Sequence, residues 1–170
     1  MVARNALIFR WTLYAAAALL CIFAQTAVLQ RIVIWGVIPF LYPAAAVIPA
    51  MFEGSVPGTI YALAIGVVCD VLLPAPIPCF YTLVFPAAGL CAALLTQSVL
   101  PANFGSALLS TAIAFLMTGL FSCLLLWVRG KAAWDTGMLV ALRECLVTLP
   151  LTLPMMALFR TVHRRGHRDD

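Results

Sequence analysis

The sequence predicts an all-α integral membrane protein in which six transmembrane helices form a bundle. Of its 170 residues, 65% are hydrophobic and only 9% are charged. An ordinary soluble domain carries about 25% charged residues, and one small core could not bury this much apolar surface. The length allows a single membrane domain, residues 1–170, and leaves no room for a sizeable soluble domain.

Six apolar stretches are each close to the roughly 20 residues that a helix needs to cross the hydrocarbon core. Turn-forming residues separate them, most clearly at Glu53-Gly54-Ser55 and in the proline-rich segment 74–78. Three prolines inside the second stretch predict a kinked or partly broken helix. The predicted spans are residues 11–29, 32–52, 57–73, 79–100, 106–128 and 137–159.

The first stretch could also be a cleaved signal peptide, because an arginine precedes an apolar run. The run continues to Leu29, which is longer than a typical signal-peptide core, and no small-residue cleavage site follows. We therefore interpret this stretch as a membrane anchor.

Basic residues gather at both ends of the chain, whose formal net charge is +4. Arg4 and Arg10 precede the first span, and residues 160–170 form a basic tail. Basic segments favour the cytoplasmic side, so we expect both termini in the cytoplasm and an even number of spans. The tail could contact anionic lipid or a cytoplasmic partner. Nothing in the composition indicates binding to nucleic acid.

Motifs for catalysis or metal binding do not stand out. The two histidines, His163 and His167, lie in the tail without an evident third ligand, and the six cysteines form no C-x-x-C pair. Neither H-E-x-x-H nor G-x-S-x-G occurs. We expect no catalytic residues, no metal and no cofactor.

Small residues recur every four positions in and before the third span. This spacing places them on one stripe of a helix, and such stripes let membrane helices approach closely. The sequence predicts a stripe that packs against another helix of this chain or against a partner. Its members are Gly54, Gly58, Ala62, Gly66 and, at the end, Asp70.

Three charged residues lie inside predicted spans, where charges are costly. Asp70 is about one turn from the predicted outer end of the third span. Arg143 and Glu144 are about two turns into the last span from the same side. Adjacent helix residues do not face each other, so we predict an ion pair between Asp70 and Arg143, direct or through water, and assign no role to Glu144.

The central third of the chain resembles the rod shape-determining protein MreD family. The elements of the resemblance occur in the same order here, although the segment after the third span is rich in proline where the family usually has glycine. They are Leu29-Gln30 at the end of the first span, Gly36-Val37-Ile38-Pro39, the glycine entry at Glu53-Gly54 and Gly58, the helix end Gly66-Val67-Val68-Cys69-Asp70-Val71-Leu72, and Tyr81 and Gly89 in the next span.

The resemblance implies a non-enzymatic subunit of the bacterial cell-elongation (rod) complex, in the cytoplasmic membrane. Such a subunit helps maintain cell shape by scaffolding peptidoglycan synthesis with the bitopic protein MreC. The family is also similar in fold to the S components of energy-coupling-factor transporters, so a vitamin-binding S component is the alternative. An S component needs a polar pocket near the outer side, for which the sequence offers Asp70, Tyr81, Thr82, Arg143 and Glu144.

Overall fold

The protein is an all-helical bundle over the residues that the computed structural model describes, 2–75, 77–98, 101–130 and 134–166. These ranges contain no β-strand and only one isolated bridge, between Ile34 and Val37. The helices are α1 (Val2–Ala27), a 3-10 turn at Leu29–Arg31, α2 (Tyr42–Glu53), α3 (Ser55–Leu72), α4 (Phe80–Ser98), α5 (Phe104–Val128), α6 (Trp134–Thr148), a 3-10 turn at Leu149–Leu151, and α7 (Thr152–Gly166).

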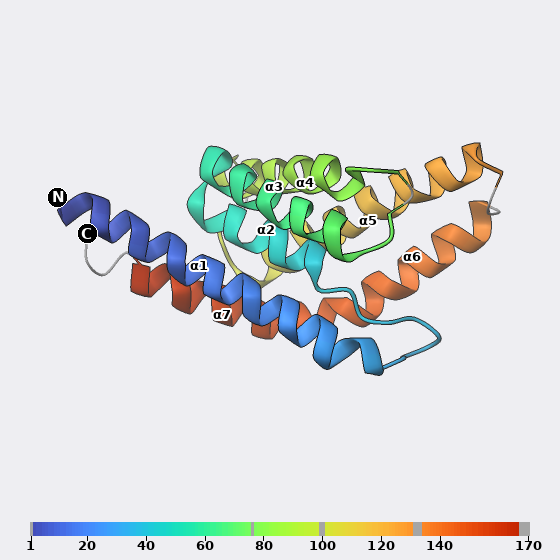
Figure 1. Ribbon diagram of the computed structural model, residues 1–170, viewed down its shortest axis with the longest axis horizontal. Coiled ribbons are helices and arrows are strands. Elements are labelled where there is room, and N and C mark those ends of the chain that lie inside the picture. The colour runs from blue at the N-terminus through green and yellow to red at the C-terminus, as the bar shows by residue number, and fades with distance from the viewer. Residues whose placement is uncertain (1, 76, 99–100, 131–133, 167–170) are drawn as a thin grey trace.

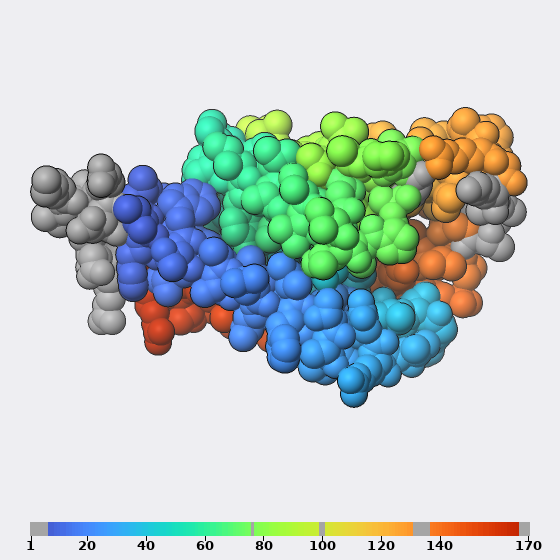
Figure 2. All heavy atoms as spheres, in the orientation of Figure 1, coloured from blue at the N-terminus to red at the C-terminus, as the bar shows by residue number. Residues whose placement is uncertain are grey.

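The chain runs back and forth along the long axis of the bundle (Figure 1). α1 begins and α7 ends at the same end, which we call the terminal end; the opposite end, with the α1–α2, α3–α4 and α5–α6 connections, is the distal end. α1 lies along α7, and in the space-filling view it covers the lower part of the visible face below α3 (Figure 2). Buried residues of α1, α2, α3, α4, α5 and α7 join in one hydrophobic core.

Five helical segments are long and apolar enough to cross a membrane: Leu7–Arg31, Ser55–Leu72, Phe80–Ser98, Phe104–Val128 and Gly137–Gly166. They correspond to the first, third, fourth, fifth and sixth predicted spans. The last segment is longer than predicted and contains the Leu149–Leu151 turn, where Pro150 interrupts the regular helix. The basic tail begins as the last two turns of α7, and residues 167–170, including His167, lie outside the described residues.

The second predicted span, 32–52, is wrong as a continuous transmembrane helix. Only α2 is helical, and its 12 residues correspond to about 18 Å. The preceding segment is a turn followed by extended chain, because Trp35 and Gly36 have positive φ angles of 53° and 79°, and Pro39 disfavours helix at the residue before it. α2 begins at Tyr42 with Pro43 in its first turn, where a proline needs no N–H partner.

α2 is the centre of the bundle although it is the shortest of these apolar helices. Its residues from Tyr42 to Met51 are all buried, and α1, α3, α4, α5 and α7 pack around it. Small residues make this possible, since Ala44, Ala46 and Ala50 are fully buried. Many large apolar side chains face outward, such as Val71, which is 80% exposed, although others, including Ile48 and Phe85, are fully buried. Small residues at helix contacts and apolar side chains on the outer surface are typical of helices packed in lipid.

α3 and α4 pack closely through the backbone around Gly66. A Cβ atom at this glycine would lie 2.6 Å from the carbonyl oxygen of Tyr81 and 2.9 Å from Cα of Thr82. Both obstacles are backbone atoms, so no side chain could rotate to make room.

We therefore expect Gly66→Ala to separate α3 from α4 and to lower the stability by about 1–3 kcal/mol, the usual cost of overpacking. Gly105→Ala is the matched control, because nothing lies within 4 Å of a Cβ at Gly105. The melting temperature of each purified variant in detergent measures the effect. Equal melting temperatures for the two variants would show that the helices are not packed this closely.

Candidate functional site

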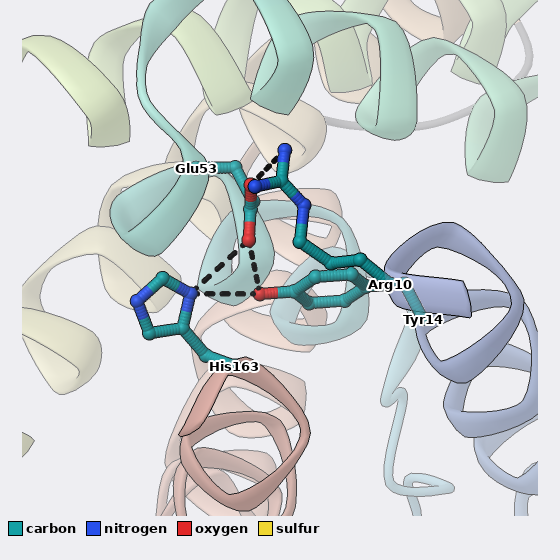
Figure 3. A network of polar contacts seen from close by, with 4 residues as sticks. All are labelled: Arg10, Tyr14, Glu53 and His163. Carbon is teal, nitrogen blue, oxygen red and sulfur yellow. Dashed lines mark hydrogen bonds and ion pairs between the residues drawn. The ribbon is translucent and has the colours of Figure 1, made fainter. Parts of the chain in front are cut away.

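A buried carboxylate at the terminal end joins three helices (Figure 3). Glu53, the last residue of α2, has a side chain only 4% exposed. Its Oε2 lies 3.1 Å from a guanidinium nitrogen of Arg10. Its Oε1 accepts a hydrogen bond of 2.7 Å from the hydroxyl of Tyr14 and lies 3.1 Å from Nδ1 of His163. A carboxylate with this many polar partners tolerates burial that an isolated one would not.

The helices α1, α2 and α7 bring these groups together. Arg10 and Tyr14 are four residues apart on α1 and so share one face. His163 comes from α7, and its ring stacks on Phe52 at a centroid distance of 5.1 Å. The hydroxyl of Tyr14 also lies 3.3 Å from Nδ1 of His163. The cluster therefore fastens α1 and α7 to the end of α2.

Sequence reasoning missed this cluster. It treated Arg10 as a topology signal, Glu53 as part of a turn and His163 as part of a tail. Two features of the sequence could have indicated the cluster. One is the i, i+4 spacing of Arg10 and Tyr14 in an apolar stretch, and the other is the single carboxylate, Glu53, at the end of another apolar stretch.

Asp70 binds the start of α4. Its Oδ1 accepts a hydrogen bond of 3.0 Å from the backbone N–H of Tyr81, and its Oδ2 accepts one of 2.8 Å from the N–H of Thr82. The hydroxyl of Thr82 also donates to Oδ2. A carboxylate at the N-terminus of a helix satisfies free N–H groups and interacts favourably with the helix dipole.

No direct ion pair joins Asp70 and Arg143 in the described part of the chain. Arg143 is exposed on α6, and the ion pairs among the described residues are those that Glu53 makes with Arg10 and His163. The predicted direct pair is therefore corrected: the α4 backbone, which sequence spacing did not place near Asp70, supplies the partners of Asp70 instead. A contact through water stays a prediction.

The small-residue stripe lies inside the chain. Gly58 faces Ala50 of α2 so closely that a Cβ there would overlap the α2 backbone. Ala62 lies against Gly89 of α4, where an added Cβ would be 2.8 Å from the Cβ of Ala62. Gly54 separates α2 from α3, with a φ of +88°. Of the two uses predicted for the stripe, the structure places it in packing within this chain.

Two buried polar side chains satisfy the irregular backbone before α2. Gln25, 3% exposed, donates to the carbonyl oxygen of Pro39 at 2.8 Å and accepts from the N–H of Leu41 at 2.8 Å. The hydroxyl of Thr148, which is fully buried, accepts from the N–H of Phe40 at 3.0 Å. Non-helical backbone at membrane depth requires such internal partners.

A cavity of about 700 Å³ opens at the distal end between α5, α6 and the two connections that precede α2 and α4. Tyr81 and Glu144 line it, whereas the other residues considered for an outer pocket, Asp70, Thr82 and Arg143, do not. The described residues contain no group of three or more histidine, cysteine or acidic side chains that could hold a metal, and their six cysteines are free thiols.

Comparison of the chain with protein-family models, with curated proteins and with solved structures finds no match.

The Glu53 cluster generates a stability prediction. We expect Glu53→Gln to lower the stability by about 2 kcal/mol, because the variant keeps the shape but loses the charge-assisted contacts to Arg10 and His163. Glu144→Gln is the matched control, since Glu144 makes no ion pair among the described residues. Thermal melting in detergent compares the two. A Glu53→Gln variant that melts with the wild type would refute a stabilising role.

The Asp70 contacts generate a second prediction. Asp70→Ala should cost about 1 kcal/mol, the usual value for a lost helix cap, and Asp70→Asn should cost less because it keeps an acceptor. Arg143→Ala should melt as the wild type does. The swap Asp70→Arg with Arg143→Asp should be no more stable than Asp70→Arg alone, and rescue by the swap would restore the ion-pair interpretation.

Proposed function

We propose that this chain is a non-enzymatic membrane subunit of the bacterial cell-elongation complex, resident in the cytoplasmic membrane with both termini in the cytoplasm. It scaffolds peptidoglycan synthesis together with a bitopic MreC-like protein. The proposal is supported by what the residues of the MreD resemblance do in this structure. Gly58, Gly66, Asp70 and Gly89 are the residues through which α2, α3 and α4 pack or are capped.

The internal use of the stripe bears on where a partner helix binds. Since the stripe is covered by α2 and α4, a bitopic partner requires another surface. The outer faces of the helices offer large apolar side chains, including Phe23 on α1, Ile60 on α3 and Phe121 on α5, which are 68%, 60% and 49% exposed. These faces are suited to lipid or to an apolar helix.

Co-expression with the MreC-like protein of the same bacterium tests the proposal. We expect the two proteins to purify together, whereas an unrelated bitopic protein should not be captured. A photoreactive phenylalanine placed at Phe23, Ile60 or Phe121 should cross-link to the partner from at least one position. The buried control is Phe85, which is fully inaccessible and should give no cross-link. Absence of co-purification would contradict the scaffold function.

The distal cavity favours a second candidate, an S component of an energy-coupling-factor transporter. Its volume of about 700 Å³ lies within the range of small-molecule sites, about 300–1,000 Å³. Such a subunit should purify with the transmembrane and ATPase components of a transporter instead of with the MreC-like protein. The same co-expression experiment, run with both sets of partners, distinguishes the two functions.

A further inference from the structure

The distal cavity contains a carboxylate that has no partner in the described part of the chain. Glu144 is partly buried in α6, within the segment Gly137–Gly166 that is suited to crossing a membrane. Among the described residues, no side chain or backbone group hydrogen-bonds to it or forms an ion pair with it. An intramembrane carboxylate is costly unless a counter-charge or a donor meets it. Since the described residues provide neither, the cavity is suited to a ligand that does.

Some of the other polar side chains in the cavity already form hydrogen bonds within the protein, and others do not. The amide of Gln25 already donates to the backbone of Pro39 and accepts from that of Leu41. Ser122 and the hydroxyl of Tyr81 line the cavity without a hydrogen-bond partner in the described part of the chain. Tyr81 and Glu144 line the same cavity, as does the amide side chain of Gln30. The available groups therefore include one anion, two hydroxyls and an amide, and no basic residue is among the described lining residues.

Three aromatic rings contribute to the same wall. The ring of Phe40 lies 6.1 Å from that of Tyr81 and 6.3 Å from that of Phe115, measured between centroids, and all three residues line the cavity. Aromatic faces attract ammonium groups, and a carboxylate adds a charge-assisted hydrogen bond. Apolar residues such as Ile38 and Val140 form much of the remaining wall. Together they fit a cation attached to an apolar body.

We propose that this cavity binds the ammonium group of an amphiphilic amine, with Glu144 as its counter-charge and the rings of Phe40, Tyr81 and Phe115 around it. An aminophospholipid headgroup and a free amine with an apolar body present the same chemistry. The proposal goes beyond the scaffold function and does not depend on it.

Binding to the purified full-length protein in detergent tests the proposal. One arm titrates fluorescent phosphatidylethanolamine against phosphatidylglycerol, which has no amine. The other arm uses calorimetry with 2-phenylethylamine against 2-phenylethanol, which has the same ring without the charge. We expect one amine to bind at least about tenfold more tightly than its matched control. Preferential binding of the amine in the lipid arm would identify a site for a lipid headgroup. Preferential binding in the free-amine arm would identify a site for a soluble ligand.

Variants connect the binding to the cavity. Glu144→Gln should weaken the amine at least about tenfold, and Glu144→Asp should restore part of the affinity. Arg143→Gln is the control, because this neighbouring side chain is exposed and does not line the cavity. Ser122→Phe fills the cavity and keeps the carboxylate of Glu144, and it should also abolish amine binding. This variant replaces Glu144→Gln in the test if Glu144→Gln does not yield monodisperse protein.

Two results would overturn the proposal. One is that each of the two amines binds with the same affinity as its own matched control without the amine. The other is wild-type affinity in Glu144→Gln or, if that variant is not monodisperse, in Ser122→Phe. Since no bitopic partner takes part in these measurements, a failed co-purification in the scaffold test would leave this result unchanged.

Discussion

The fold depends on satisfying the backbone of a broken helix in the middle of an apolar bundle. Residues 38–40 lie outside any helix, so their polar backbone groups and the N–H of Leu41, which caps α2, have no helical partners. Gln25 from α1 and Thr148 from the end of α6 supply the missing hydrogen bonds. Each unpaired group would cost about 1–3 kcal/mol if buried. The first and last apolar segments are consequently needed to hold the second one in place.

This constraint also explains the composition of the core. Small residues let the neighbouring helices approach α2 closely. Ala44, Ala46 and Ala50 are fully buried, and Gly58 and Gly89 let α3 and α4 come close. Large side chains of α2 such as Tyr42 and Ile48 are buried as well, while many large apolar side chains of the other helices lie on the outer surface, where lipid can cover them.

The sequence was sufficient to predict those helices whose bounds follow from the length of an apolar stretch. The third, fourth and fifth spans agree with α3, α4 and α5 within a few residues, because helix ends there coincide with proline, glycine or polar residues. Span length failed at residues 32–41, where the positive φ of Trp35 and the side chain of Gln25 outweigh an apolar composition. The prolines indicated a break but not its position.

The contacts of the charged residues were less predictable, for a different reason. Glu53 meets a histidine 110 residues away, and Asp70 meets N–H groups 11 and 12 residues away. The first contact depends on how the terminal helices are arranged, which a single sequence does not reveal. The second depends on the backbone, which carries no residue-specific signal. The depth argument that linked Asp70 to Arg143 considered side chains only.

The arrangement around Glu53 also imposes an order on biosynthesis. α1 and α2 leave the ribosome before α7, so Arg10 and Tyr14 are the first of its partners to be made. His163 is made more than 100 residues after Glu53, and its docking completes the shell around the carboxylate. The α2 terminus is therefore closed only after α7 has been made, and a nascent chain that stops before α7 is left with an incompletely satisfied charge at its terminal end.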